Sequence, residues 1–242
     1  MYYGYGYGYF AYILYMLPVF LLGLWAQMRV KSAYNKYSKV YNTRGITGAQ
    51  AAQMILSHYG ITDVRIQPIS GKLTDNYNPK TKVISLSEGV YNSRSVAAVG
   101  IACHEAGHAA QHAENYVPNN IRSAMVPVTN IGSRFGLIIA FAGMFLAALT
   151  ALDVLGETMI YIGLALYALV AVFQLVTLPV EFNASRRALK VIESDNILYD
   201  ESERKGAKKV LTAAALTYVA ALATAIANLL YYASILLGNR RR

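Results

Sequence analysis

Long uncharged apolar segments dominate the hydrophobic pattern of this 242-residue chain. They cover residues 10–28, 135–152, 159–180 and 211–237. Each segment is long enough to cross the roughly 30 Å hydrocarbon core of a bilayer as a helix. A chain of this length could not bury all of them as core helices and still keep a soluble surface. The pattern therefore predicts an integral membrane protein whose chain crosses the bilayer at each of these segments.

Shorter periodicities after the first span predict a small region of mixed structure. Residues 47–59 have the apolar spacing of an amphipathic helix, and Gly60 follows as a stop signal. Residues 63–69 alternate between apolar and polar positions, as in a half-buried strand. Residues 75–79 read as a turn, and residues 82–87 as the strand that returns from it. We therefore expect a small α+β region between the first two spans.

Composition and charge agree with a membrane protein and predict its orientation. Hydrophobic residues make up 55% of the chain, charged residues only 14%, and the net charge is +9. Lysines and arginines gather after the first span and between the third and fourth, whereas the link between the second and third carries only Asp153 and Glu157. The positive-inside rule places the basic segments in the cytoplasm and the acidic link outside. Because topology and anionic lipid account for the basic charge, no nucleic-acid partner is expected.

Both ends of the chain carry distinctive segments. Residues 1–9 form a Gly/Tyr-rich tail that lacks the positive region and the cleavage site of a signal peptide. The first span is therefore predicted to be a retained anchor. Its tail lies outside, either with its tyrosines at the lipid interface or as a disordered, self-associating segment. With four spans, residues 240–242, all arginine, also lie outside, against the charge rule, so the last span has the least certain orientation.

The candidate chemistry is in an HExxH motif, His104-Glu105-Ala106-Gly107-His108, which continues a run of small and apolar residues that predicts a helix. Side chains four apart lie on the same face of a helix, so both imidazoles can reach one zinc ion while Glu105 acts on the attacking water. Gly107 allows close approach beside the metal. The single cysteine, Cys103, is expected to be a small buried residue of this helix. The motif thus predicts a zinc site rather than a chance match.

A catalytic zinc normally takes three protein ligands, so one remains to be found. His112 continues the spacing, but it lies about 12 Å along the helix axis from His104, too far to share the ion. Two crossings return the chain to the side that it left, which brings Glu181, at the end of the third span, beside His104 and His108. The alternative is an interfacial carboxylate paired with a neighbouring arginine.

Several segments resemble a known family. Residues 71–77, residues 86–91, the HEAGH helix and residues 178–189 look like the YugP-type membrane zinc metallopeptidases, and the resemblance covers nearly the whole chain after the tail. It implies a zinc peptidase more firmly than any particular substrate. The HEAGH string also occurs in the FtsH proteases, but those need an ATPase domain, and the chain has no GxxxxGK[ST] phosphate loop.

A more distant similarity is to the HtpX and Ste24 membrane proteases. Their third zinc ligand is a glutamate in an ExxxD pattern after intervening spans. Glu181 matches this glutamate, whereas Ser185 stands at the position of the aspartate. In those enzymes the aspartate orients a ligand histidine, so the similarity implies that Asn183 or Ser185 takes this role here.

These predictions combine into one organisation. The fold class is mainly α, a multi-span helical membrane protein with a small α+β zincin-like catalytic region in the cytoplasm. The predicted parts are the tail and anchor (1–28), the catalytic region (29–130), a hairpin of two spans (131–180), a cytoplasmic segment with the third ligand (181–210), and the last span with its basic tail (211–242).

The predicted function is that of a multi-pass zinc metalloendopeptidase of the cell membrane. His104, His108 and Glu181 hold Zn²⁺, and Glu105 is the catalytic base that transfers a proton from the zinc-activated water to the leaving amine. Its substrates would be membrane or membrane-proximal proteins and peptides. A zinc-binding membrane scaffold or adaptor without turnover is the alternative, whereas a transporter is disfavoured because the spans hold almost no ionisable residues. Small-residue stretches allow contacts with other membrane proteins or with a second copy.

Overall fold

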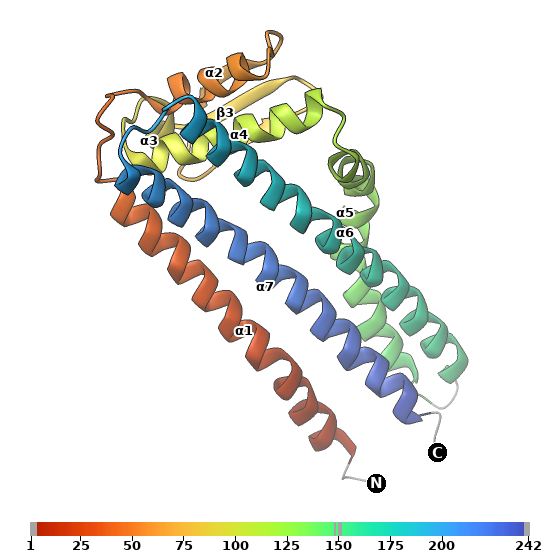
Figure 1. The fold of residues 1–242 in the computed structure, drawn as a ribbon. Coiled ribbons are helices and arrows are strands. Elements are labelled where there is room, and N and C mark those ends of the chain that lie inside the picture. The colour runs from red at the N-terminus through yellow and green to blue at the C-terminus, as the bar shows by residue number, and fades with distance from the viewer. Residues whose placement is uncertain (1–3, 148, 150–151, 240–242) are drawn as a thin grey trace. The chain divides into compact units, whose positions relative to one another are not determined.

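The computed structural model describes residues 4–147, 149 and 152–239, and Figure 1 shows its elements in chain order. The structure is mainly helical, with one small sheet. Its elements are α1 (Gly4–Tyr37), α2 (Gly48–His58), β1 (Arg65–Ile69), β2 (Asn76–Asn78), β3 (Val83–Ser87), α3 (Glu88–Tyr91), α4 (Val96–Ala113), α5 (Val117–Ala147), α6 (Asp153–Ser194) and α7 (Glu201–Asn239).

Four helices in the described part of the chain, α1, α5, α6 and α7, are long and apolar enough to cross a membrane. Each overlaps one of the segments that the hydrophobic pattern predicts as a span. All four extend beyond the predicted segments into polar sequence, and α6 is the longest with 42 residues. Once a helix has formed, each further residue adds one backbone hydrogen bond. The helix can therefore continue beyond the end of the apolar stretch.

The N-terminal tail differs from the prediction. The helix α1 already begins at Gly4, so residues 4–9 continue the anchor helix instead of forming a separate irregular tail. Residues 1–3 lie outside the described part. Glycine lowers helix propensity by only about 1 kcal/mol per residue, and an existing apolar helix can extend through alternating Gly and Tyr without a new nucleation step.

The chain divides into two compact units, each built from separate stretches of sequence. The first contains residues 1–25, 121–177 and 218–242. Within it, α5 and α6 approach closely because glycines face each other: a Cβ added at Gly163 would lie 2.5 Å from the carbonyl oxygen of Gly136. In the same way, a Cβ at Gly143 would lie 2.6 Å from the Gly156 carbonyl oxygen. Small residues are the usual means by which helices pack inside a bilayer.

The second unit contains residues 26–120 and 178–217 and holds the sheet, α2, α3 and α4. Its core includes Ile55 and Leu56 of α2, Ile84 and Leu86 of β3 and Val99 of α4, all fully buried. The helix α2 begins at a capping box in which Thr47 and Gln50 bond each other's backbone N–H groups. It ends at His58 with Tyr59 as its C-cap, directly before Gly60 at φ +65°, as the stop signal predicts.

The sheet has the order β1-β3-β2, which corrects the predicted hairpin. β1 pairs with β3 in parallel, whereas β2, which lies within the predicted turn, pairs with β3 in antiparallel fashion. The true turn comes after Asn78, whose side-chain oxygen accepts from the N–H of Lys80 at 2.9 Å. The Asp75 carboxylate accepts the Ser87 N–H at 2.7 Å and so holds the segment before β2 against the end of β3.

Candidate metal centre

The helix α4 carries the HExxH motif through the core of the second unit. Its N-terminus is capped by Ser95, whose hydroxyl oxygen accepts the Ala98 N–H at 3.2 Å. The residues around the motif are small and buried, including Cys103, and burial raises the pKa of the Cys103 thiol. The rings of His104 and His108 lie on one face of α4 with their centroids 4.7 Å apart. The helix therefore presents both imidazoles side by side, as the spacing predicts.

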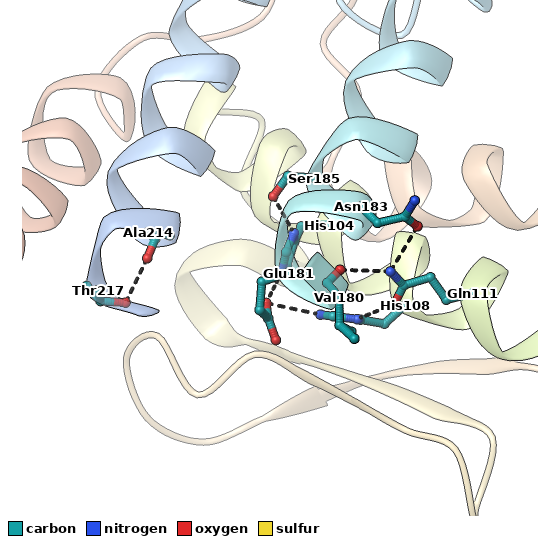
Figure 2. A network of polar contacts seen from close by, with 9 residues as sticks. All are labelled: His104, His108, Gln111, Val180, Glu181, Asn183, Ser185, Ala214 and Thr217. Atoms are coloured by element: carbon teal, nitrogen blue, oxygen red, sulfur yellow. Dashed lines mark hydrogen bonds and ion pairs between the residues drawn. The ribbon is translucent and has the colours of Figure 1, made fainter. Parts of the chain in front are cut away.

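Glu181 reaches this pair from α6 (Figure 2). Its Oε2 atom lies 3.2 Å from Nε2 of His104 and 3.4 Å from Nε2 of His108. Zinc–ligand bonds of about 2.0–2.1 Å at tetrahedral angles place neighbouring ligand atoms about 3.3 Å apart. The side chain of Glu181 is only 2% exposed, so its carboxylate is shielded from solvent where it faces the histidines. Two imidazoles and one carboxylate at these separations fit a zinc ion.

One of the two arginines that follow Glu181 bonds elsewhere. Arg187 donates to the Glu114 carboxylate at 2.6 Å and to Oδ1 of Asn183 at 2.7 Å. These bonds disfavour Arg187 as the partner of Glu181.

Gly107 lies where the backbones of α4 and α6 approach each other closely. A Cβ added there would lie 2.6 Å from the backbone oxygen of Ala184, closer than side-chain atoms can approach. The glycine of the motif therefore does not line an open space. It lets the backbone of α6 approach α4 closely enough for Glu181 to reach both histidines.

The outer nitrogen of each histidine has its own polar neighbour. Ser185 Oγ lies 3.1 Å from Nδ1 of His104, and Gln111 Oε1 lies 3.0 Å from Nδ1 of His108 (Figure 2). Ser185 thus occupies the place that the distant similarity assigns to an aspartate. Asn183 contacts Gln111 and acts on His108 only through it.

A chain of hydrogen bonds determines which nitrogen of His108 can bind a metal. The guanidinium of Arg187 can only donate, so Asn183 Oδ1 must accept. Gln111 Nε2 then donates to that oxygen at 3.0 Å and to the Val180 carbonyl oxygen at 2.7 Å. The remaining Oε1 of Gln111 must accept from His108 Nδ1–H, so that the neutral ring has its lone pair on Nε2, which faces Glu181. Nε2 is therefore the nitrogen of His108 that is free to bind a metal ion.

Gln111 is a functional candidate that was not predicted from the sequence. Gln111 lies three residues after His108, and side chains at this spacing meet on a helix surface. This spacing was the sequence signal for a contact between Gln111 and His108. Gln111 is fully buried, whereas a glutamine without a specific partner is normally exposed. The spacing alone could not show that its amide also bonds α6.

The motif glutamate, Glu105, is 9% exposed. Burial raises the pKa of its carboxyl above the ordinary value, while the nearby His104 and His108 act in the opposite direction. A carboxyl with a raised pKa is better suited to accept and return a proton near neutral pH. His112, which spacing excludes as a ligand, instead lies with Nδ1 2.9 Å from the hydroxyl of Tyr77, and burial raises the pKa of Tyr77 to about 12.

The fold and the site together define a class: a helical membrane protein with an HExxH helix and a third candidate ligand from a distant helix. Comparison with known proteins agrees with this class. Residues 12–237 match the model of a family described as "Putative neutral zinc metallopeptidase", and the chain belongs to this family. It is 43% identical over 231 residues, 93% of this chain and 99% of the relative, to "Putative membrane protease YugP" of Bacillus subtilis (strain 168). No solved structure matches the chain.

Proposed function

We propose that this protein is a membrane-embedded zinc metalloendopeptidase, with His104, His108 and Glu181 as its zinc ligands. The observation that carries the proposal is the approach of Glu181 Oε2 to within 3.2 and 3.4 Å of the two histidine nitrogens. These groups come from α4 and α6, and His104 and Glu181 are 77 positions apart in the sequence. Family membership supports zinc as the metal.

The chemistry follows from the residues around the ion. Zinc, when bound, lowers the pKa of water and polarises a peptide carbonyl. Glu105 takes the proton of the attacking water and passes it to the departing amine, and its burial suits both steps. Ser185 and Gln111 hold the rings of His104 and His108 in orientation.

The proposed location is the cell membrane, crossed by α1, α5, α6 and α7. The distribution of lysine and arginine supports a cytoplasmic catalytic region formed by residues 29–130 and residues 181–210. The spans of residues 131–180 separate these parts in the sequence, and the last span follows at residue 211. Because Glu181 comes directly after the apolar stretch of the third span, the site suits protein or peptide substrates in the membrane or close to it.

The proposal is tested with purified protein and an unfolded membrane-protein substrate. Glu105→Gln should keep one zinc per chain and lose hydrolysis by about 10²-fold or more, because general acid–base catalysis contributes that much. Glu181→Gln should lose both zinc and hydrolysis. The matched control is Glu88→Gln, an exposed glutamate outside the site, which should change neither.

Two outcomes would overturn the proposal. Unchanged hydrolysis in Glu105→Gln would reject the assigned base. A zinc-loaded wild-type protein that cleaves no substrate would instead favour a zinc-binding scaffold without turnover.

A further inference from the structure

A basic cavity lies between α1 and α7 in the second unit, apart from the metal centre. Its volume is about 470 Å³, within the range of small-molecule sites. Five of its eleven lining residues are cations, and no carboxylate is among the described residues that line it. The lining cations are Arg29, Lys36, Lys205, Lys208 and Lys209.

The cavity is formed by one face of each helix. The lining residues of α1 begin at Arg29 and continue at 32, 33, 36 and 37, and those of α7 begin at Lys205 and continue at 208, 209, 212, 213 and 216. This is the i, i+3, i+4, i+7 spacing of a single helix face. Facing surfaces of two packed helices are normally apolar, so cations on both are unusual for a purely structural contact.

The two helices are in direct contact at the end of this cavity. A Cβ added at Gly206 of α7 would lie 2.7 Å from the ring of Tyr37 of α1, so the glycine is needed for the contact. Figure 1 shows the end of α1 beside the start of α7. Because the close contact holds the two helix backbones together, the cations of both faces stay near one another. Among the cations, Lys205 is paired with Glu201 at 2.7 Å, but Glu201 does not line the cavity.

The cavity also lies where both helices change from basic to apolar sequence. Arg29 directly follows the exposed apolar residues Trp25 and Met28 of α1. On α7, Lys209 is followed by the apolar sequence of the last span, and Ala213 and Leu216 continue the cavity wall in that direction. The cavity is therefore basic along most of its length and becomes apolar at Leu216, as a lipid requires for its phosphate and its acyl chains.

We propose that this cavity binds the phosphate group of an anionic membrane lipid, with the lysines of α1 and α7 around the phosphate and Leu216 toward the acyl chains. A phosphate neutralises cations on both faces at once and joins the two helices. The positive-inside rule alone requires positive charge near the span but no particular helix face. The gathering of cations on the facing sides of α1 and α7 is therefore evidence for a lipid site that the positive-inside rule does not explain.

The test measures lipid binding to the purified full-length protein in detergent by native mass spectrometry. The pocket variant is Lys36→Gln/Lys209→Gln. The matched control is Lys31→Gln/Lys39→Gln, which removes the same charge from exposed lysines that do not line the cavity. The pocket variant should bind phosphatidylglycerol at least about tenfold more weakly than wild type, and the control should bind it as wild type does. Phosphatidylcholine with the same chains should bind the wild type more weakly than phosphatidylglycerol.

Further arms separate the lipid from other sources of the same chemistry. Inorganic phosphate in large excess should not displace phosphatidylglycerol, because it lacks acyl chains. Displacement by phosphate alone would overturn the lipid assignment in favour of a soluble anion. Equal loss in the pocket and control variants, or equal binding of both lipids, would also overturn the proposal. Lys36→Arg/Lys209→Arg keeps the charge and should restore binding, which excludes misfolding as the cause of the loss.

Discussion

At the scale of single residues, the candidate metal centre depends on uncharged neighbours. Ser185 and Gln111 contact the outer nitrogens of the two histidines, at 3.1 and 3.0 Å. A hydroxyl or an amide makes its histidine partner less basic than a carboxylate would, but it still determines which nitrogen carries the proton. Gln111 has the larger role because its amide nitrogen also bonds Val180 and Asn183 of α6.

Replacing Gln111 should therefore weaken zinc binding without removing a ligand. Gln111→Leu leaves His108 Nδ1 without its acceptor and the Val180 carbonyl without its donor. We expect zinc affinity to fall about 10- to 100-fold, as is usual for partners of ligand histidines. Competition with a chelator of known affinity measures this change. Gln53→Leu, at an exposed position of α2, is the control, and equal zinc affinity in both variants would contradict the role of Gln111.

At the scale of elements, glycines determine how closely the long helices pack. Gly107 sets the contact of α4 with α6, and facing glycines set the contact of α5 with α6. In both contacts an added Cβ would meet backbone atoms, which cannot move aside as the end of a flexible side chain can. Packing of this kind depends on very few positions.

A single methyl group at Gly163 should therefore destabilise the α5–α6 pair. In Gly163→Ala the new Cβ would lie 2.5 Å from the Gly136 oxygen and 2.6 Å from the Ala140 nitrogen. Overpacking of this kind costs roughly 1–3 kcal/mol, which thermal unfolding in detergent would detect. Gly23→Ala is the matched control, since nothing lies within 4 Å of its Cβ, and it should be neutral or slightly stabilising. Equal melting temperatures in the two variants would contradict the packing argument.

The elements also show what the sequence can and cannot predict. The length of the apolar segments was sufficient to predict the long helices, and Thr47 and Gly60 were sufficient to predict the limits of α2. These signals are local in the sequence. The strand signals of residues 63–69 and 82–87 were local too. Their parallel pairing was missed because it depends on Asp75 and on β2, a strand of only three residues that reads as a turn. Pairing partners are not a local property of sequence.

At the scale of the whole molecule, the order of the spans brings the candidate ligands together. Glu181 was predicted beside His104 and His108 only because two crossings return the chain to the same side, and the structure brings the three together. The bonding of Gln111 to α6 could not be predicted, because it depends on the rotation of α6 about its own axis. Counting spans gives the side of the membrane and leaves that rotation undetermined.

Sidedness can be measured directly with single cysteines in a Cys103→Ala background. Lys39→Cys and Lys190→Cys should react with a membrane-impermeant maleimide only after the cytoplasmic side is exposed. Asp153→Cys should react in intact cells, since it lies in the acidic link. All these positions are exposed in the structure, so burial does not limit labelling. Labelling of Lys39→Cys and Lys190→Cys from opposite sides would exclude a shared metal centre.

The second unit is assembled from two stretches of sequence, residues 26–120 and 178–217, with the α5–α6 hairpin between them. A ribosome delivers these stretches in order, so the histidines of α4 leave it long before Glu181 does. A chain interrupted before α6 would carry an intact HExxH helix but no third donor. If the proposed function holds, zinc binds with full affinity only once the hairpin has been inserted, and a partly synthesised chain has no hydrolytic activity before that point.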